Sequence, residues 1–379
     1  MRSRCPLSAV SAATLAACGG SELKVFPPLK RTALPAGSAL RPWSPTVATR
    51  AAPQLAAAGP GGSAFIALTN LDANYAPGGP GLLVRLQPDT GAQVVIPLGG
   101  ADDRGCSNSG VVKNENGVLV AVCSGGFGAD PAGRAIVEVN PATNAVARTA
   151  KAPAGFQPSA VAVAAKKIWV GDFNLPRVYS VDRTTFAVVD GADAAHPATD
   201  LPCAAPYTYV ADLLVAGGDL FALCGAADGY LVRLDSGTGA LKGDKVLVGA
   251  QPVAMALTGD GRIAVSNSTS GTLSLDSIGA SALTVARDVV VFGKSAALQD
   301  VRARGSFLYT VTTGTNAVQK LDLAAKDQTR LVVAEQPTGD NSGPYSILPL
   351  DDNQAIVTNN LTGEVVGVNF SKTATSTTP

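Results

Sequence analysis

The stretch Leu234-Asp235-Ser236-Gly237-Thr238-Gly239 joins the end of a short apolar run to a tight turn. The same junction occurs seven times: a Leu or Val is followed by Asp, Asn or Gln, and the chain then turns. The polar residues at the junctions are Gln87, Asn140, Asp182, Asp235, Asp276, Asp322 and Asn369. Their successive separations are 53, 42, 53, 41, 46 and 47 residues, with a mean of 47. The chain is therefore made of copies of one unit.

The length of this unit predicts the fold. A period near 47 residues, built from short strands, is typical of a β-propeller, in which each repeat is one four-stranded sheet. No segment has the long amphipathic period of a helix, which argues against an α/β fold. We predict an all-β, seven-bladed β-propeller with four-stranded antiparallel blades. The blades are expected near residues 53–100, 104–153, 157–196, 200–249, 251–294, 297–338 and 343–370.

The seventh repeat ends one strand short, after Val365 to Phe370. An unpaired edge strand exposes backbone donors and acceptors, and closure of the ring removes that edge. We therefore expect an N-terminal strand from residues 23–50 to complete the last blade. Leu23 to Phe26 and Thr46 to Thr49 are both candidates, and the pattern does not choose between them. The first strand of each blade is expected to carry small alternating residues, as in Gln157 to Val163.

Composition limits the class of partner. The chain has 379 residues, a formal net charge of zero and only 15% charged residues. Nucleic-acid binding requires a concentrated positive surface that releases counterions, and no such cluster is present in the repeats. We expect no nucleic-acid partner and a monomeric protein.

The N-terminus has the charge and length of an export signal. Arg2 and Arg4 precede a short apolar stretch that ends in Leu15-Ala16-Ala17-Cys18. This ending resembles the bacterial lipobox, which implies cleavage before Cys18 and lipidation of that cysteine. A plain secretory signal that happens to contain a cysteine is the alternative. Because Gly19 replaces the Asp that retains many lipoproteins at the inner membrane, the pattern implies an outer-membrane lipoprotein of the bacterial cell envelope, periplasmic or surface-exposed.

These features divide the chain into four parts. Residues 1–17 are expected to be the signal peptide, and residues 18–52 a lipid-anchored tether that includes the closing strand. Residues 53–370 form the propeller, and residues 371–379 are expected to be a disordered tail.

Four further cysteines lie within the repeats: Cys106, Cys123, Cys203 and Cys224. An oxidising compartment favours pairing, although four cysteines permit three connectivities. Cys106 precedes the first strand of one repeat and Cys123 ends its second strand, and the other two cysteines occupy matching places two repeats later. Since these places lie side by side in an antiparallel hairpin, we predict disulfides 106–123 and 203–224. A metal site is the alternative, but CxxC spacing and a nearby histidine are missing.

The stretch Ile263 to Asp276, with a Gly turn at Gly271, resembles the repeat of YVTN-type (YncE-like) propellers. Ile356-Val357-Thr358-Asn359 repeats the pattern, and Asn140-Pro141-Ala142-Thr143-Asn144 is similar to the turn of that family. The resemblance covers residues 53–370. It implies a seven-bladed propeller, often exported, from a family whose functions are mostly unassigned.

The loops between second and third strands should project from one face of the propeller. Aromatic and charged residues in these loops are candidate anchors for a partner, because Tyr and Arg are favoured at binding hot spots. The candidates are Tyr75, Phe127, Phe173, Arg177 and Tyr230. The alternative is that they only pack their own loops.

Two function classes remain. The first is a non-enzymatic binding or scaffold module with an unknown protein or carbohydrate partner. The second is a hydrolase or lyase, since seven-bladed lactonases share this architecture, but His196 is the only histidine and stands in a loop between blades. We expect no catalytic residue, no cofactor and no metal. The alternative Ca²⁺ site would use dispersed loop residues, namely Asp72, Asp130, Asp172 and Asp228.

Overall fold

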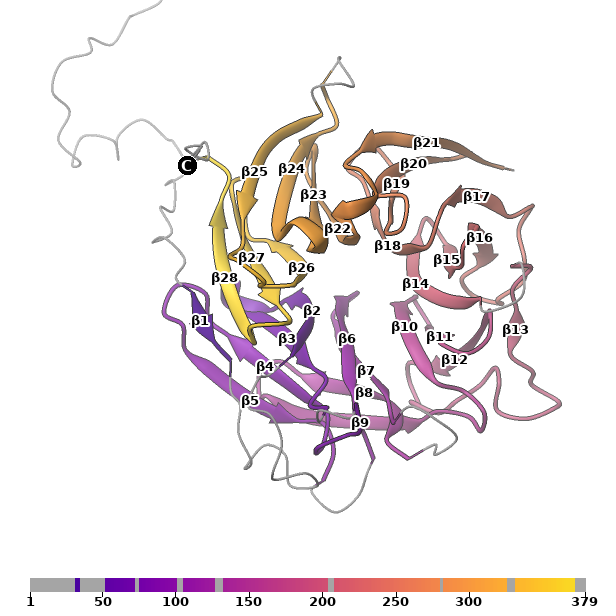
Figure 1. The fold of residues 1–379 in the computed structure, drawn as a ribbon. Coiled ribbons are helices and arrows are strands. Elements are labelled where there is room, and N and C mark those ends of the chain that lie inside the picture. The colour runs from indigo at the N-terminus through magenta and orange to yellow at the C-terminus, as the bar shows by residue number, and fades with distance from the viewer. Residues whose placement is uncertain are drawn as a thin grey trace, which may run out of the picture.

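The computed structural model describes residues 31–34, 52–71, 75–100, 105–126, 132–203, 208–279, 282–325 and 331–371. Seven four-stranded antiparallel sheets stand in a ring around a central channel (Figure 1). The predicted seven-bladed β-propeller is confirmed. Three short 3-10 helices are the helical turns of the described chain, at Pro60–Gly62, Lys294–Ala296 and Thr313–Thr315.

Each blade runs from an innermost strand at the channel to an outermost strand at the rim. Blade 1 contains β2 (Pro53–Ala58), β3 (Ala64–Leu68), β4 (Leu82–Leu86) and β5 (Gln93–Pro97). Blade 2 contains β6 (Ser109–Glu115), β7 (Val118–Ser124), β8 (Arg134–Asn140) and β9 (Ala145–Lys151). Blade 3 contains β10 (Pro158–Val163), β11 (Lys167–Asp172), β12 (Arg177–Asp182) and β13 (Thr199–Asp200). Blade 4 contains β14 (Tyr209–Ala216), β15 (Asp219–Gly225), β16 (Gly229–Asp235) and β17 (Val246–Gly249). Blade 5 contains β18 (Pro252–Leu257), β19 (Arg262–Asn267), β20 (Thr272–Ile278) and β21 (Leu283–Val291). Blade 6 contains β22 (Leu298–Arg304), β23 (Phe307–Thr312), β24 (Ala317–Asp322) and β25 (Val332–Pro337). Blade 7 contains β26 (Pro344–Pro349), β27 (Gln354–Asn359), β28 (Glu364–Asn369) and β1 (Thr32–Ala33).

The ring is closed by an N-terminal strand, as expected. β1 pairs with β28, with Thr32 opposite Val365. This strand is neither of the two candidate segments, and both of those lie outside the described residues. The closing segment is short, so a single apolar residue anchors it: Leu34 is 5% exposed and packs in the core between blades 7 and 1, while its N–H donates to the carbonyl of Gly363. One apolar residue is too weak a sequence signal to identify such a strand.

The core lies between neighbouring blades. In β15, Phe221 packs with Ile263 of blade 5, while Ala222 faces the other way and packs with Trp169 of blade 3. A strand that is covered on both faces reads as a continuous apolar run rather than an alternating one. Burial of each large side chain stabilises the fold by about 2 kcal/mol.

Blade 3 differs from the expected boundaries. It extends beyond residue 196, because its outermost strand β13 pairs with β12 at Thr199 and Asp200. The chain between these strands first covers part of the β12 edge, where the N–H of Val189 donates to the carbonyl of Ser180. His196 therefore stands in a loop within blade 3, and its expected position between blades is wrong.

Candidate functional site

A β-bulge interrupts the innermost strand of every blade, close to its first residue. A bulge adds one residue to a strand and thereby re-aims a side chain. The residues at these bulges are Gln54 and Leu55, Gly110, Ser159, Ala211, Val253, Gln299 and Tyr345, and all of them line one cavity. The fold thus builds the wall of this cavity seven times from the same backbone irregularity.

The cavity has a volume of about 640 Å³. Residues from loops between second and third strands also line it, among them Tyr75, Phe173 and Asn360. The cavity therefore opens on the face that the sequence predicts for partner binding. Its size is in the range of small-molecule binding sites. We call this space the channel-mouth cavity.

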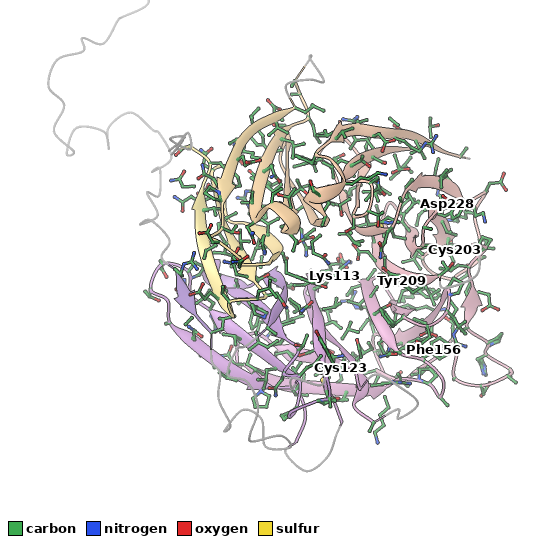
Figure 2. All side chains as sticks on the ribbon, viewed as in Figure 1. Lys113, Cys123, Phe156, Cys203, Tyr209 and Asp228 are labelled. Carbon is green, nitrogen blue, oxygen red and sulfur yellow. A yellow bond between two sulfur atoms is a disulfide. The ribbon has the colours of Figure 1, made fainter. Side chains whose placement is uncertain are left out.

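One side of the channel-mouth cavity contains a buried lysine in an ion pair. Nζ of Lys113 on β6 donates to Oδ1 of Asp212 on β14 at 2.9 Å and to the carbonyl of Leu213 at 2.5 Å. Oδ2 of Asp212 accepts a hydrogen bond from the N–H of Met255 in blade 5 at 3.0 Å. Lys113 and Tyr209 are seen beside the channel in Figure 2. This network joins blades 2, 4 and 5 through side chains at the channel wall.

A second ion pair lies on β22. Oδ2 of Asp300 accepts from Nε of Arg302 at 3.0 Å, from Oγ of Ser346 at 2.7 Å and from the N–H of Ile347 at 3.1 Å. Burial alone would lower the pKa of Arg302, but the nearby carboxylates of Asp300 and Asp212 more than offset burial and raise it. Arg302 is therefore a permanent cation, and its charge is balanced within the wall.

The aromatic residues Phe173 and Tyr345 line other parts of the wall, and Tyr209 lies behind Phe173. The ring of Phe173 is tilted against that of Tyr209, with centroids 5.4 Å apart. Burial, with the negative charge of Asp300 as the next cause, raises the pKa of Tyr345 to about 12. Burial also raises the pKa of Tyr209. Both phenols are protonated near neutral pH, so they serve as neutral hydrogen-bonding groups rather than as bases.

The structure separates the predicted binding residues. Tyr75 and Phe173 line the channel-mouth cavity and are 69% and 44% exposed. Arg177 does not line it; its guanidinium lies 3.7 Å from the ring centroid of Phe156. Tyr230 also lies outside the cavity lining, with Nζ of Lys245 4.3 Å from its ring centroid. Phe127 is outside the described residues.

Sequence reasoning missed the four charged residues of the wall, Lys113, Asp212, Asp300 and Arg302. The expectation of small residues at the channel is met by the alanines of β10 but is wrong for these strands. A signal is clear only in β14, where Asp212 interrupts an apolar first strand, because β6 and β22 contain several other polar residues. In β22, Asp300 and Arg302 are two residues apart and form an ion pair on one face of the strand.

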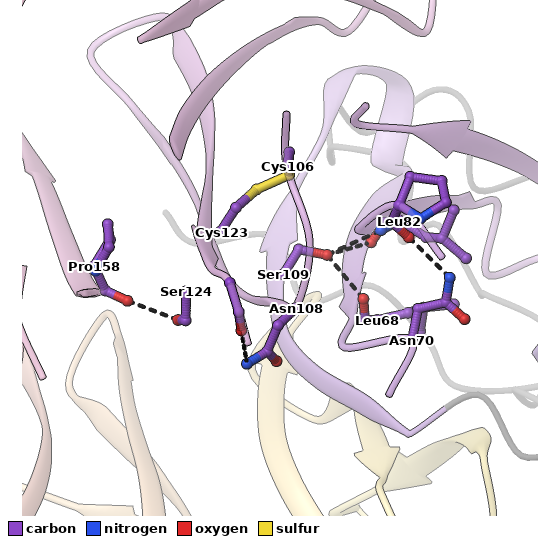
Figure 3. The surroundings of a disulfide bond; sticks show 11 residues. Leu68, Asn70, Leu82, Cys106, Asn108, Ser109, Cys123, Ser124 and Pro158 are labelled. Atoms are coloured by element: carbon purple, nitrogen blue, oxygen red, sulfur yellow. Dashed lines mark hydrogen bonds between the residues drawn. A yellow bond between two sulfur atoms is a disulfide. The ribbon is translucent and has the colours of Figure 1, made fainter. Parts of the chain in front are cut away.

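Both predicted disulfides are present, with Cα atoms 5.4 Å apart in Cys106–Cys123 and 6.4 Å apart in Cys203–Cys224. Figure 3 shows how the first one stands among hydrogen bonds that join blades 1 and 2. Oγ of Ser109 donates to the carbonyl of Leu68 at 2.8 Å and accepts from the N–H of Leu82 at 2.9 Å. The disulfide therefore braces the face on which the cavity opens. Two disulfides indicate an oxidising, extracytoplasmic compartment.

Acidic and imidazole groups are dispersed. Within the described ranges, no group of three or more His, Cys, Asp or Glu residues has the geometry of a metal site. Asp172 is engaged by Nε of Arg177 at 2.7 Å, while Asp72 and Asp130 lie outside the described residues. His196 is exposed, with Nδ1 3.0 Å from Oδ1 of Asp193. Over the same part of the chain, no helix is long and apolar enough to cross a bilayer.

Comparison with known proteins identifies the fold. No protein-family model matches the chain, and no curated protein matches it. Among solved structures, streptogramin B lyase has a TM-score of 0.64 at 12% identity, over 90% of this chain and 97% of that one.

Two further structures are similar. A catalytically inactive histidine-to-alanine variant of virginiamycin B lyase from Staphylococcus aureus, solved with quinupristin, has a TM-score of 0.60 at 12% identity, over 85% and 97% of the two chains. BamB from Moraxella catarrhalis has a TM-score of 0.51 at 15% identity, over 84% and 85%. At these identities the likeness concerns the fold alone.

Proposed function

We propose that this protein is a lipid-anchored β-propeller of the bacterial cell envelope, of the YVTN-repeat type, that binds a ligand in its channel-mouth cavity. The observation that carries the proposal is a cavity of about 640 Å³ whose charged lining residues already neutralise one another. Such a wall suits binding, because its ionic groups are paired with one another across the channel wall.

The direct test is capture of the ligand from the native envelope with the full-length protein. Ala211 lines the cavity and Ala147 is exposed on β9, so Ala211→Trp and Ala147→Trp form a matched pair. Ala211→Trp should fill the cavity and abolish capture, whereas Ala147→Trp should leave capture unchanged. Equal capture by both variants, with unchanged circular dichroism, would refute a role for the cavity.

Anchoring has a separate test. Cys18 lies outside the described residues, and the proposal for it depends on the lipobox-like ending Leu15-Ala16-Ala17-Cys18. Cys18→Ser should move the protein from the membrane fraction to the soluble fraction. If the variant stays with the membrane, the anchor is elsewhere.

The alternative is a propeller hydrolase or lyase that uses the same cavity. Its support is the likeness in fold to streptogramin B lyase. The histidine-to-alanine change makes the similar virginiamycin B lyase inactive, whereas the single histidine of this chain, His196, is exposed in blade 3 and does not line the cavity. The test is turnover of a cyclic ester substrate. Activity that is lost in Ala211→Trp but kept in His196→Ala would favour an enzyme that acts in this cavity without using a histidine.

A further inference from the structure

One amide of the channel-mouth cavity has an unused donor. Gln157 precedes β10, lines the cavity and is 3% exposed. Its Oε1 accepts a hydrogen bond from Nδ2 of Asn174 at 3.2 Å. Nε2 of Gln157 is buried and has no acceptor among the described residues. A buried N–H group normally has a partner, because leaving it without one forfeits the hydrogen bond it makes in water.

Hydrogen bonds hold Gln157 and Asn174 next to one another. In this arrangement the oxygen of the Gln157 amide faces Nδ2 of Asn174, and the nitrogen faces away from it. Asp172, which is fully buried, accepts from the N–H of Gln157 at 3.1 Å and from the N–H of Asn174 at 3.1 Å. The other oxygen of Asp172 accepts from Nε of Arg177. Arg177 is thus a positioning residue that does not line the cavity: it holds Asp172, and Asp172 holds the backbone of Gln157 and Asn174.

An exposed aromatic ring stands beside this donor. Phe173 follows Asp172 directly, and its N–H donates to the carbonyl of Gln157 at 2.8 Å. Its ring is 44% exposed and leans on Tyr209. A buried donor without an acceptor and an exposed aromatic ring therefore belong to two lining residues that are joined by a backbone hydrogen bond.

The rest of the lining indicates the charge and polarity of the ligand. The charged lining residues are two cations, Lys113 and Arg302, and two carboxylates, Asp212 and Asp300. This balance gives an ionic ligand no net attraction. The uncharged polar groups of the lining are hydroxyls and five carboxamides, the latter at Gln54, Asn108, Gln157, Gln299 and Asn360. Each carboxamide can both donate and accept, which matches hydroxyl groups.

We propose that the channel-mouth cavity binds a neutral oligosaccharide, with one sugar ring packed on Phe173 and one oxygen of that ring accepting a hydrogen bond from Nε2 of Gln157. A sugar ring has an apolar C–H face and a hydroxyl edge, so it satisfies both features at once. The inference rests on the proposed function, since it names the ligand class of the same cavity.

The test is isothermal titration of the full-length protein in detergent with short cello-, chito-, xylo-, manno- and malto-oligosaccharides. At least one series should bind at one site per chain. Gln157→Met keeps the length of the side chain but removes the donor, and we expect it to weaken binding by about 10-fold or more, the scale of one hydrogen bond to a buried partner. Phe173→Ala should weaken binding to a similar degree.

Gln87→Met is the matched control, because Gln87 lies in blade 1 outside the cavity lining and should leave the affinity unchanged. Circular dichroism and thermal unfolding establish that each variant is folded. Absence of binding by every series, or binding that is equal in Gln157→Met and the parent protein, would overturn the inference.

Failure of the inference and failure of the proposed function give different results. If envelope capture depends on Ala211 but the captured ligand is a peptide, the oligosaccharide inference is wrong and the binding cavity stands. If an oligosaccharide binds equally well to the Ala211→Trp variant, the site is elsewhere and both are wrong.

Discussion

Blades 4 and 5 are neighbours that share an apolar interface. Each has an aspartate at the strand-to-turn junction of the repeat, Asp235 in blade 4 and Asp276 in blade 5, but the first is solvated and the second is buried. At the end of β16, Oδ1 of Asp235 accepts from the N–H groups of Gly237 and Thr238 at 3.0 and 2.9 Å. Oδ2 of Asp235 pairs with Nζ of Lys242 at 2.8 Å. The hydrogen bond from Lys242 and those from Thr238 hold the pKa of Asp235 well below its usual range.

The equivalent carboxylate of blade 5 is fully buried. Asp276 lies opposite Ile263 on β19 and Val285 on β21, and neither of its oxygens has a donor among the described residues. Burial raises the pKa of Asp276 to about 7. The cause is strand length: β20 continues to Ile278, so the turn comes after the carboxylate instead of at it. The junction motif sets the repeat, but the length of the strand decides whether its carboxylate caps a turn or is enclosed in the sheet.

The largest effect is expected from the disulfide of blade 4, a constraint that blade 5 lacks. Cys203 and Cys224 are separated by 21 residues, and a cross-link over such a loop stabilises by about 3 kcal/mol in the chain-entropy model. Cys203→Ser with Cys224→Ser should lower the free energy of unfolding by this amount while the propeller stays folded. Urea unfolding measures it, with Cys106→Ser and Cys123→Ser as the matched pair in blade 2. An unchanged urea midpoint would show that blade 4 does not depend on the bond.

The next effect concerns Asp276. Its folded pKa of about 7 lies above the ordinary carboxyl value, so the folded protein binds more protons than the unfolded chain between these values. Stability should therefore fall as pH rises from about 4 to about 7. Asp276→Asn removes the titration and should stabilise the protein at pH 8, with little effect at pH 4.

The measurement is urea unfolding of Asp276→Asn at both pH values. Asp288→Asn is the control, because Asp288 is exposed on β21 of the same blade. An equal gain at both pH values would mean that ionisation of Asp276 is not the cause.

The fold was predictable from sequence because the repeat is a property of many residues at once. Seven junctions and seven apolar second strands agree on the architecture, so an error in any one of them changes little. The closing strand was predictable in kind but not in place, since Leu34 alone anchors it in the core. The disulfide pairs followed from matched positions in two blades.

The site was predictable only as a face. Tyr75 and Phe173 were found because aromatic residues stand out in loops, and both line the cavity. The bulges were not predictable, because a bulge depends on the backbone and is occupied by residues as different as Gly110 and Tyr345. Gln157 was not predictable as a lining residue with an unpaired donor, since its contact with Asn174 crosses a hairpin.

A smaller effect is expected from Asp219, which gives blade 4 an ionic cluster. Asp219 is 5% exposed and accepts from Nε of Arg233 at 2.7 Å and from Nζ of Lys242 at 2.8 Å. Burial would raise the pKa of Asp219, but these two cations more than offset it and lower the pKa. Asp219→Asn should cost about 1 kcal/mol at neutral pH. This contribution is present above the ordinary carboxyl pKa and is lost as pH falls, so urea unfolding of parent and variant should converge at low pH.

The smallest effect is expected from Asp235, and it separates the turn from the ion pair. In blade 2 the same position is Asn140, whose Oδ1 accepts from the N–H groups of Ala142 and Thr143 at 2.9 and 3.3 Å, so an amide oxygen is sufficient for the turn. Asp235→Asn should therefore keep most of the stability, and Asp235→Ala should lose more.

The pH dependence of Asp235 also has the opposite sign to that of Asp276. The lowered pKa of Asp235 means that its contribution is fully present above the ordinary carboxyl pKa and is lost as pH falls from there toward the lowered pKa of the folded state. Thermal unfolding across pH, at low and high salt, is the measurement. High salt should reduce the difference between the parent and Asp235→Asn, which concerns Lys242, but not the difference between Asp235→Asn and Asp235→Ala, which concerns the turn. If salt reduced both differences equally, the contribution of Asp235 would be ionic throughout. The backbone hydrogen bonds of Asp235 would then not explain the difference between the junctions of blades 4 and 5.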